Sequence, residues 1–215
     1  MSSDLVEITL LSLAVSGAAT LVSLLIGLPI GTWLALKRFR SRHLVLSVVN
    51  TGMALPPVVA GLFIAVLLWR SGILGGLGLM YTPGAMVLAE VVIATPIVIG
   101  LTVAALGQLD PRLELQLQGL GASRRQTVWW LWREARLPLL AAVMAAFGSV
   151  ISEVGAAMMV GGNISHETRV LTTAIVLETG RGEFGNAIVL GFVLMALAFI
   201  VNGILTWAQQ RGPRR

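Results

Sequence analysis

Two carboxylates interrupt long apolar stretches of the sequence, and their side chains are the first candidates for chemistry. Glu90 lies in the apolar run 85–106, and Glu153 lies in the run 139–160. If both runs are helices, a rise of about 1.5 Å per residue places each carboxylate about 10 Å from the end of its run. The two ends fall on the same side of consecutive antiparallel helices. We therefore expect the two carboxylates to lie at one depth and within reach of each other.

Three roles for Glu90 and Glu153 are open from the sequence. They are structural, capping interrupted backbone or pairing with Arg169, or they line a pathway or gate. In the third role they relay protons, as ionisable groups inside membranes do in pumps. This alternative would make the protein a proton-coupled secondary transporter. An intramembrane enzyme would need a serine–histidine pair, a histidine cluster or paired aspartates. The sequence offers none of these, so we expect no catalytic residue.

A further set of candidates lies in the segment 161–186. Arg169 supplies a cation, and Thr172 and Thr173 supply hydroxyl donors, which are groups suited to an anion. We expect this segment to form part of a gate or docking surface, with ordinary turn stabilisation as the alternative. His43 and His166 each stand alone in a polar loop and the chain has no Cys. We therefore expect neither a metal site nor a resident cofactor.

The elements that carry these residues are apolar enough to cross a membrane. Hydrophobic residues make up 56% of the 215 residues and charged residues 12%, whereas soluble domains carry about 25% charged residues. A span needs roughly 20 apolar residues, and five runs are long enough: 8–36, 44–69, 85–106, 139–160 and 187–208. We expect an all-α, multi-pass integral membrane protein with five transmembrane helices in one domain, 1–215.

The Lys and Arg residues indicate which loops face the cytoplasm, because cytoplasmic loops collect them. The segment 37–43 holds four, the segment 107–138 holds five and the tail QQRGPRR holds three. The N-terminal segment and the two other loops hold three between them. This distribution predicts that the N-terminus lies outside and the C-terminus in the cytoplasm. The loop 107–138 is then cytoplasmic, and 161–186 lies outside.

Glycine and proline also occur inside the apolar runs. Gly27 and Gly31 have the spacing that lets another backbone approach closely, and we expect Pro56–Pro57 and Pro96 to interrupt the second and third helices. Interrupted backbone at membrane depth needs neighbouring helices or a water-lined cavity, so tight packing and a hinge-lined path are both open. The chain has no internal repeat, and five helices do not divide evenly. A symmetric pathway therefore predicts a homodimer.

The segment 107–138 is long for a simple connection. Its first part alternates Leu with Glu and Gln, which predicts a short helix that ends at Gly119–Leu120–Gly121. Ser123 is a residue type that caps helices, so a second helix is expected over 124–136. The Trp and Arg residues of that helix would suit the bilayer interface. The loop is thus predicted to be a helix, a glycine turn and a second helix.

This loop resembles the Glu-Ala-Ala loop of type I ATP-binding-cassette importer permeases. The segment PRLELQLQGLGASRRQT is similar to the family's pattern of Glu-Ala-Ala, three residues and Gly, with Gly121 as the signature glycine. The positions 115–117 hold Leu-Gln-Leu instead of Glu-Ala-Ala, and the nearest carboxylate is Glu114. In that family the loop docks on the ATPase subunit. The resemblance implies these coupling residues: Glu114, Gly119, Gly121, Ala122 and Ser123.

Two other segments narrow the resemblance. TGMALPPVVAGL at 51–62 is similar to the Leu-Pro-Pro segment of molybdate, tungstate and sulfate permeases. ISEVGAAMMVGGNISHETRVLTTAIVLET at 151–179 is similar to their Glu-x-Gly-Ala to Ala-Ile stretch. With REAR at 133–136, the likeness is nearest to tungstate permeases. The implied function is the membrane-spanning subunit of an ATP-driven oxyanion importer, for tungstate first and molybdate second, in a bacterial or archaeal plasma membrane.

The resemblance also implies the partners. They are a second copy of the chain, two ATPase subunits that bind ATP-Mg, an extracytoplasmic oxyanion-binding protein and the membrane lipid. A phosphate-binding loop requires Gly-x-x-x-x-Gly-Lys followed by Ser or Thr. The only lysine is Lys37, and Arg38 follows it. The chain therefore depends on a separate ATPase, and nothing in it suggests nucleic-acid binding.

Overall fold

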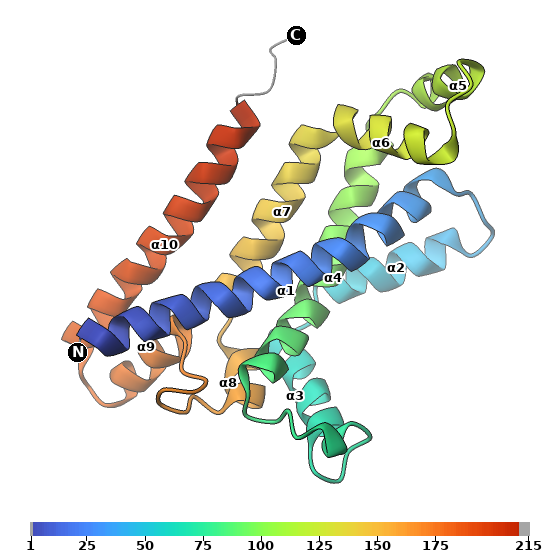
Figure 1. The fold of residues 1–215 in the computed structure, drawn as a ribbon. Helices are drawn as coiled ribbons and strands as arrows, with labels where there is room; N and C mark the ends of the chain where they lie inside the picture. Colours follow the sequence, from blue (N-terminus) through green and yellow to red (C-terminus); the bar gives the residue numbers. More distant parts are fainter. Residues whose placement is uncertain (1, 211–215) are drawn as a thin grey trace.

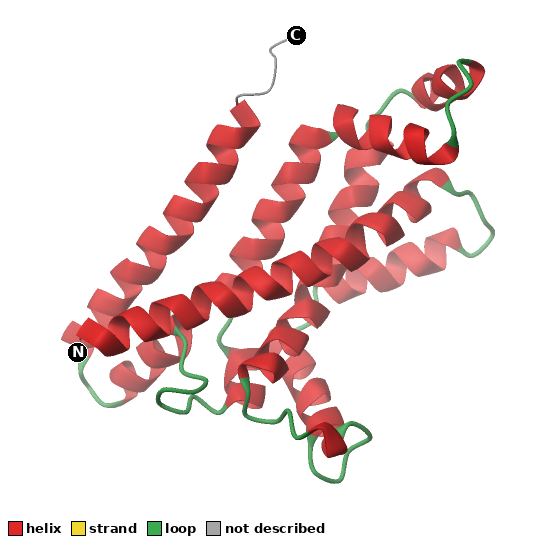
Figure 2. Ribbon diagram, in the orientation of Figure 1, coloured by secondary structure: helices red, strands yellow, loops and turns green. Residues whose placement is uncertain are grey.

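The computed structural model describes residues 2–210, and every regular element within them is helical (Figure 2). In chain order the elements are α1 (Ser2–Leu36), α2 (Arg42–Met53), α3 (Pro57–Leu68), the 3₁₀ turn η1 (Gly75–Leu77), α4 (Pro83–Gly107), α5 (Pro111–Gly119), α6 (Arg124–Glu134), α7 (Arg136–Ile151), α8 (Gly155–Gly161), α9 (Leu171–Gly180) and α10 (Phe184–Gln210). The all-α architecture predicted from the composition is confirmed.

Three of these helices are long and apolar enough to cross a membrane by themselves: α1, α4 and α10. Two bent pairs pass the same test if each pair counts as one span, which brings the number to five. The pair α2–α3 bends by 98°, and the pair α6–α7 bends by 75°. The predicted count of five spans therefore corresponds to three continuous helices and two broken ones.

The break between α2 and α3 lies at Pro56–Pro57, as the sequence predicted. Pro57 is the first residue of α3, where its missing N–H costs nothing, and Pro56 has the extended backbone that a residue before proline prefers. The chain therefore turns sharply between the two helices instead of crossing as one rod.

Pro96 does not interrupt its helix, contrary to expectation. Helix α4 runs without a break from Pro83 to Gly107, with Pro96 inside it. The proline ring packs against Gly52 of α2, where an added Cβ would meet the ring at 3.0 Å. Neighbouring helices make an internal proline tolerable in membrane proteins, and here a glycine provides the room.

The predicted run 139–160 contains a break that its composition conceals. Helix α7 ends at Ile151 and α8 begins at Gly155, so Glu153 lies in the connection between two helices and not inside one. At the other end of α7, Ala135 is both the last cap of α6 and the first cap of α7. The fourth span thus has irregular backbone at both of its ends.

Helices α1 and α4 form the centre of the bundle. A Cβ added at Gly27 would lie 2.6 Å from Val98 Cγ1, and one added at Gly31 would lie 2.6 Å from Thr102 Cβ. The glycine pair therefore allows the two backbones to approach each other, as its spacing predicted.

The bundle has two distinct ends (Figure 1). The start of α1 lies near α9 and the start of α10 at one end, and the connection between α1 and α2 lies near α5 and α6 at the other. The two loops that are richest in Lys and Arg, 37–43 and 107–138, therefore lie at the same end of the molecule.

Candidate functional site

The first candidate site is the helix–turn–helix segment α5, Leu120–Ser123 and α6, called the elbow from here on. Asp110 starts it, because its carboxylate accepts a hydrogen bond of 2.8 Å from the backbone N–H of Arg112. Pro111 occupies the first position of α5, where proline favours helix initiation. The local sequence thus sets the start of the elbow without help from tertiary contacts.

The turn of the elbow depends on Gly121. Its φ of +79° lies in the left-handed region that glycine adopts most easily. An added Cβ would meet nothing within 4 Å, so the backbone conformation alone requires glycine here. The N–H of Gly121 donates to the carbonyl of Gln118 at 2.9 Å, and the N–H of Ala122 donates to that of Leu117 at 3.0 Å. These bonds end α5 and reverse the chain.

Ser123 caps the second helix of the elbow, which confirms the sequence prediction. Its hydroxyl accepts from the N–H of Gln126 at 3.4 Å, and the Gln126 side chain accepts from the N–H of Ser123 at 2.8 Å. This reciprocal capping box satisfies two backbone donors at once. The elbow therefore has defined geometry at its start, at its turn and at the entry to α6.

The elbow presents apolar side chains to the exterior. Leu115 is 69% exposed and Leu120 is 85% exposed. Glu114, on the same helix as Leu115, accepts a hydrogen bond of 3.2 Å from the side chain of Gln118. A projecting turn with uncovered leucines is a surface suited to contact with another protein.

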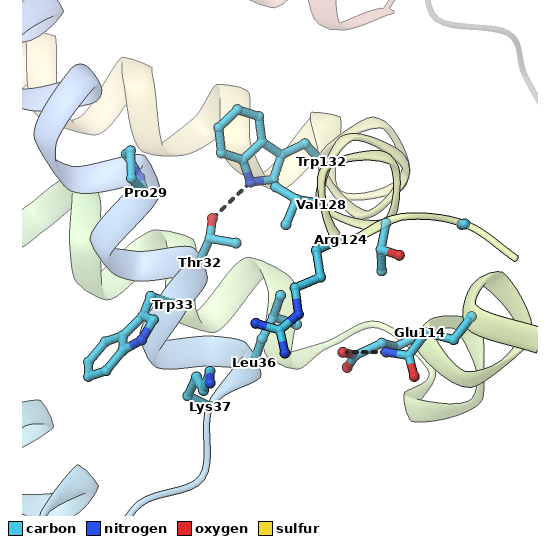
Figure 3. A pocket seen from close by; sticks show the side chains of 12 residues that line it. Pro29, Thr32, Trp33, Leu36, Lys37, Glu114, Arg124, Val128 and Trp132 are labelled. Atoms are coloured by element: carbon cyan, nitrogen blue, oxygen red, sulfur yellow. Dashed lines mark hydrogen bonds between the residues drawn. The ribbon is translucent and has the colours of Figure 1, made fainter.

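The elbow is attached to the bundle through α6. The indole N–H of Trp132 donates to the hydroxyl of Thr32 on α1 at 2.8 Å (Figure 3). Leu131 and Ala135 are buried against Leu106 at the end of α4. Helix α6 is therefore held against both central helices, while the turn before it projects.

The second candidate site is a small polar cavity at the opposite end of the bundle. It has a volume of about 10 Å³, enough for about one water molecule, and its polar lining consists of Ser12, Ser16, Glu90, Glu153 and Thr172. Glu90 is only 3% exposed, and its Oε2 has no hydrogen-bond partner within the described residues. The two carboxylates that the sequence placed at one depth therefore line the same cavity.

Glu153 stabilises the break before α8. Its Oε1 accepts a hydrogen bond of 3.1 Å from the backbone N–H of Ala156, in the first turn of α8. Its own carbonyl accepts a 2.8 Å hydrogen bond from the hydroxyl of Thr172. Glu153 thus caps interrupted backbone, which is one of the structural roles that the sequence left open, and connects the break to α9.

Arg169 and Thr173 are neighbours in sequence of the lining residues Val170 and Thr172, but they are not part of the cavity lining. The guanidinium of Arg169 donates to Asn163 Oδ1 at 3.3 Å and to Ser165 Oγ at 3.4 Å, so of the structural alternatives the pairing of a glutamate with Arg169 is not the one observed. Thr173 is buried, and its hydroxyl accepts from the N–H of Val170 at 3.1 Å. Both threonine hydroxyls already bond backbone atoms, that of Thr172 the carbonyl of Glu153 and that of Thr173 the N–H of Val170.

Two contacts that position these sites were not predicted. Ser12 Oγ accepts a 2.8 Å hydrogen bond from the N–H of Leu171, which joins α1 to the start of α9. The Trp132–Thr32 bond joins α1 to the elbow. Each hydroxyl lies in an apolar helix far from its partner in sequence, so no local signal marks it.

Within the described residues, no group of three His, Cys, Asp or Glu side chains is arranged to hold a metal.

A family model for binding-protein-dependent transport system inner membrane components matches residues 27–211. The chain belongs to this family. It is a membrane permease subunit of the ATP-binding-cassette type, and the resemblance inferred from the elbow, the Leu-Pro-Pro segment and residues 151–179 is confirmed. Permease subunits are not catalytic, in agreement with the sequence.

Several relatives align over nearly the whole chain. A probable anion ABC transporter permease protein of Haloferax volcanii is 38% identical and covers 98% of this chain and 93% of its own length. The tungstate uptake system permease protein TupB of Peptoclostridium acidaminophilum is 36% identical over 94% and 89%. The molybdenum transport system permease protein ModB of Escherichia coli is 31% identical over 94% and 92%.

Solved structures of related transporters share the fold. The chain superposes on a subunit of the methionine ABC transporter MetNI, solved in inward-facing conformations, with a TM-score of 0.75 and 23% identity, over 98% of this chain and 95% of that chain. An amino acid ABC transporter chain gives a TM-score of 0.71 and 16% identity over the same shares. The bent spans and the elbow thus belong to a known permease architecture.

Proposed function

We propose that this chain is the membrane-spanning subunit of an ATP-driven importer for an oxyanion, with tungstate as the first candidate and molybdate as the second. The relatives named for anion, tungstate and molybdenum transport support this substrate class. The tungstate relative is 36% identical and the molybdenum relative 31%, which supports tungstate as the first candidate.

The proposed orientation places the elbow end of the bundle in the cytoplasm. The loops 37–43 and 107–138 hold nine of the fifteen Lys and Arg residues, and cytoplasmic loops collect these residues. The N-terminus and the connections around α8 and α9 then lie outside. An extracytoplasmic binding protein would deliver the anion on that side.

The elbow is the proposed contact with the ATPase. Gly121, Ala122 and Ser123 set the turn, Glu114 and Gly119 belong to the helix before it, and the leucines around them are exposed. Two ATPase subunits bind ATP-Mg and drive the cycle from the cytoplasm. When they close, the elbow moves, and α6 carries the motion to α1 through Trp132 and Thr32.

The proposed assembly contains two copies of this chain. Helix α10 contributes an apolar face that this chain leaves exposed, with Phe192, Met195 and Phe199 among its uncovered side chains. Lipid or a second copy must cover it, and a two-fold pathway between copies supplies the symmetry that five spans lack.

The gate is the proposed site of Glu90, Glu153 and Thr172. These residues come from α4, from the break between α7 and α8 and from α9, so a shift of one broken span against another changes their cavity directly. Arg169 and Thr173 support this gate by fixing the chain just before and at the start of α9.

A proton-coupled carrier using Glu90 and Glu153 is the rival function, and membership of an ATP-driven family does not favour it.

The observation that supports the coupling role is the left-handed backbone of Gly121 in the projecting turn. The variant Gly121→Pro tests this role. Proline cannot reach a φ of +79° and removes the N–H that bonds Gln118. In proteoliposomes with the partner ATPase, we expect ATP hydrolysis to persist and tungstate uptake to fall at least tenfold. Gly121→Asn, which tolerates the left-handed region, should retain most of the uptake.

Three outcomes would count against the proposal. Unchanged uptake in Gly121→Pro would remove the coupling role of the elbow. Uptake that a protonophore abolishes and that survives inactivation of the ATPase would favour the proton-coupled carrier. Uptake of sulfate in preference to tungstate and molybdate would overturn the substrate assignment.

A further inference from the structure

A cavity of about 620 Å³ separates the end of α1 from the elbow. Its walls come from the last two turns of α1, from α5 and from α6 (Figure 3). The Trp132–Thr32 hydrogen bond joins two residues of its lining, one on α6 and one on α1. The coupling proposal uses this bond but gives the cavity itself no role.

Two cations from separate elements line the cavity. Lys37 directly follows α1, and Arg124 is the first residue of α6. Figure 3 shows both side chains on the side of the cavity that faces away from Pro29. Within the described residues, neither forms an ion pair or a hydrogen bond through its side chain. Two unpaired cations facing one space attract a group with negative charge.

The remainder of the wall is mostly apolar. Pro29, Trp33 and Leu36 contribute from α1, and Val128 and Trp132 contribute from α6. From Pro29 to Lys37 the helix rises about 12 Å, so the cavity extends from the charged end of α1 into its membrane-crossing part. A ligand that fills this space needs a charged end and an apolar body.

We propose that this cavity binds an anionic phospholipid. The phosphate lies between Lys37 and Arg124, and an acyl chain follows α1 past Trp33 towards Pro29. The proposal concerns lipid binding and does not depend on the transported substrate. A lipid in this position touches both α1 and the elbow, so it adds a second link beside the Trp132–Thr32 bond.

The chemistry of the walls argues against other occupants. A free oxyanion would use the two cations but leave the aromatic and apolar wall in contact with water. A segment of a soluble partner would have to reach the membrane-crossing part of α1, near Pro29. A phospholipid satisfies both halves of the cavity because its two ends differ in the same way.

Glu114 gives the proposal a test of opposite sign. Its carboxylate also lines the cavity and is held by the side chain of Gln118. A negative charge at this position opposes an anionic headgroup. Removing it should therefore strengthen lipid binding, whereas removing Lys37 or Arg124 should weaken it.

The test uses the full chain, assembled with its partners, in phosphatidylcholine nanodiscs. Phosphatidylglycerol with brominated acyl chains is added at increasing mole fraction, and tryptophan fluorescence is read because Trp33 and Trp132 line the cavity. Brominated phosphatidylcholine gives the background from lipid around the other tryptophans. We expect wild type to reach half-quenching at a mole fraction of phosphatidylglycerol at least tenfold lower than that of phosphatidylcholine.

The variants separate the cavity from general attraction. The pair Lys37→Gln with Arg124→Gln should raise the half-quenching fraction of phosphatidylglycerol to that of phosphatidylcholine, because each cation near a membrane surface contributes about fivefold. Glu114→Gln should lower it about fivefold. The matched control is Arg112→Gln with Arg125→Gln, which removes the same charge from the elbow but not from the cavity wall, and it should stay near wild type.

Four results would overturn the proposal. The first is equal quenching by the two brominated lipids in wild type, and the second is an equal loss of preference in the cavity pair and the control pair. The third is displacement of the brominated phosphatidylglycerol by millimolar inorganic phosphate, which would make a free oxyanion the occupant. The fourth is a preference seen only in the permease without its ATPase, which would mean that the ATPase fills the cavity.

Discussion

The indole of Trp132 donates a 2.8 Å hydrogen bond to the hydroxyl of Thr32, and this bond joins the elbow to the first transmembrane helix. The Thr32 hydroxyl also donates to the carbonyl of Leu28 at 2.7 Å. The oxygen is therefore oriented by its own helix before it accepts from Trp132. The contact between α6 and α1 therefore has a defined direction.

Trp132→Phe should weaken this link while keeping an aromatic ring in place. We expect a loss of about 1 kcal/mol in the free energy of unfolding, as for one hydrogen bond, together with more ATP hydrolysed per anion transported. Trp130→Phe is the control, because Trp130 contacts Arg133 and has no bond to α1. Equal transport stoichiometry in the two variants would remove the role of the Trp132 bond.

Gly121→Ala should destabilise the elbow through its backbone. A left-handed alanine costs about 1–2 kcal/mol, part of which is offset by the lower entropy of the unfolded chain, so we expect a net loss of about 1 kcal/mol. Gly119→Ala, in helical conformation with no atom within 4 Å of the new Cβ, should be neutral or stabilising. Denaturant unfolding in detergent measures both, and equal losses would contradict the conformational argument.

Gly31→Ala should disturb the contact between α1 and α4. The added Cβ would lie 2.6 Å from Thr102 Cβ and 2.9 Å from the carbonyl oxygen of Ile99, and overpacking of this kind costs about 1–3 kcal/mol. Gly17→Ala lies on the same helix with nothing within 4 Å, and it should gain about 0.5–1 kcal/mol. Thermal unfolding of the two purified variants compares them, and a stable Gly31→Ala would show that the helices can separate without cost.

Glu153→Ala should destabilise the break before α8 by about 1 kcal/mol, the usual cost of losing a cap. Glu153→Gln retains an oxygen that accepts from the N–H of Ala156, so its unfolding free energy should stay near wild type. Uptake assays then distinguish the two roles of the residue. Full uptake in Glu153→Gln means that the acceptor suffices, whereas lost uptake in a stable protein means that the charge serves the gate.

The contact between His166 and Glu7 should make stability depend on pH. The carboxylate lies 2.9 Å from His166 Nδ1, and this hydrogen bond and its charge raise the pKa of His166 above its ordinary value of 6.5. A raised pKa in the folded state adds stability that is fully present below the unfolded pKa and is lost as pH rises through the folded one. The melting temperature of wild type should therefore exceed that of Glu7→Gln at about pH 5.5, and the difference should shrink by about pH 8.5. A difference that grows with pH would contradict this sign.

Local patterns in the sequence predicted much of the fold. The double proline at Pro56–Pro57 stops any helix, and the Gly–Ala–Ser turn specifies the end of one helix and the start of the next. Pro96 was wrongly expected to break α4 because the effect of an internal proline depends on what packs beside it. The glycine that accommodates it, Gly52, is more than forty residues away and carries no local sign of that contact.

The candidate sites were predictable only in part. Spacing from the helix ends brought Glu90 and Glu153 to one depth, and both line one cavity. The break at Glu153 was not visible, because only Ser149, Ser152 and Glu153 are polar in a run that is otherwise apolar. The partners of Arg169 and the two threonines were not predictable for a related reason, because the sequence shows which donors are available but not which atoms they already bond.

Helices α6 and α7 meet at 75° with a single buried residue, Ala135, shared between them. Because the two axes are nearly perpendicular, a displacement of α6 along its own axis would move the end of α7 mainly sideways. Lateral displacement of a long helix at one end tilts it about its packed middle and moves the other end in the opposite direction. If the elbow is driven in this way, we expect a short movement at one face of the membrane to open the other face without any change in the length of the span.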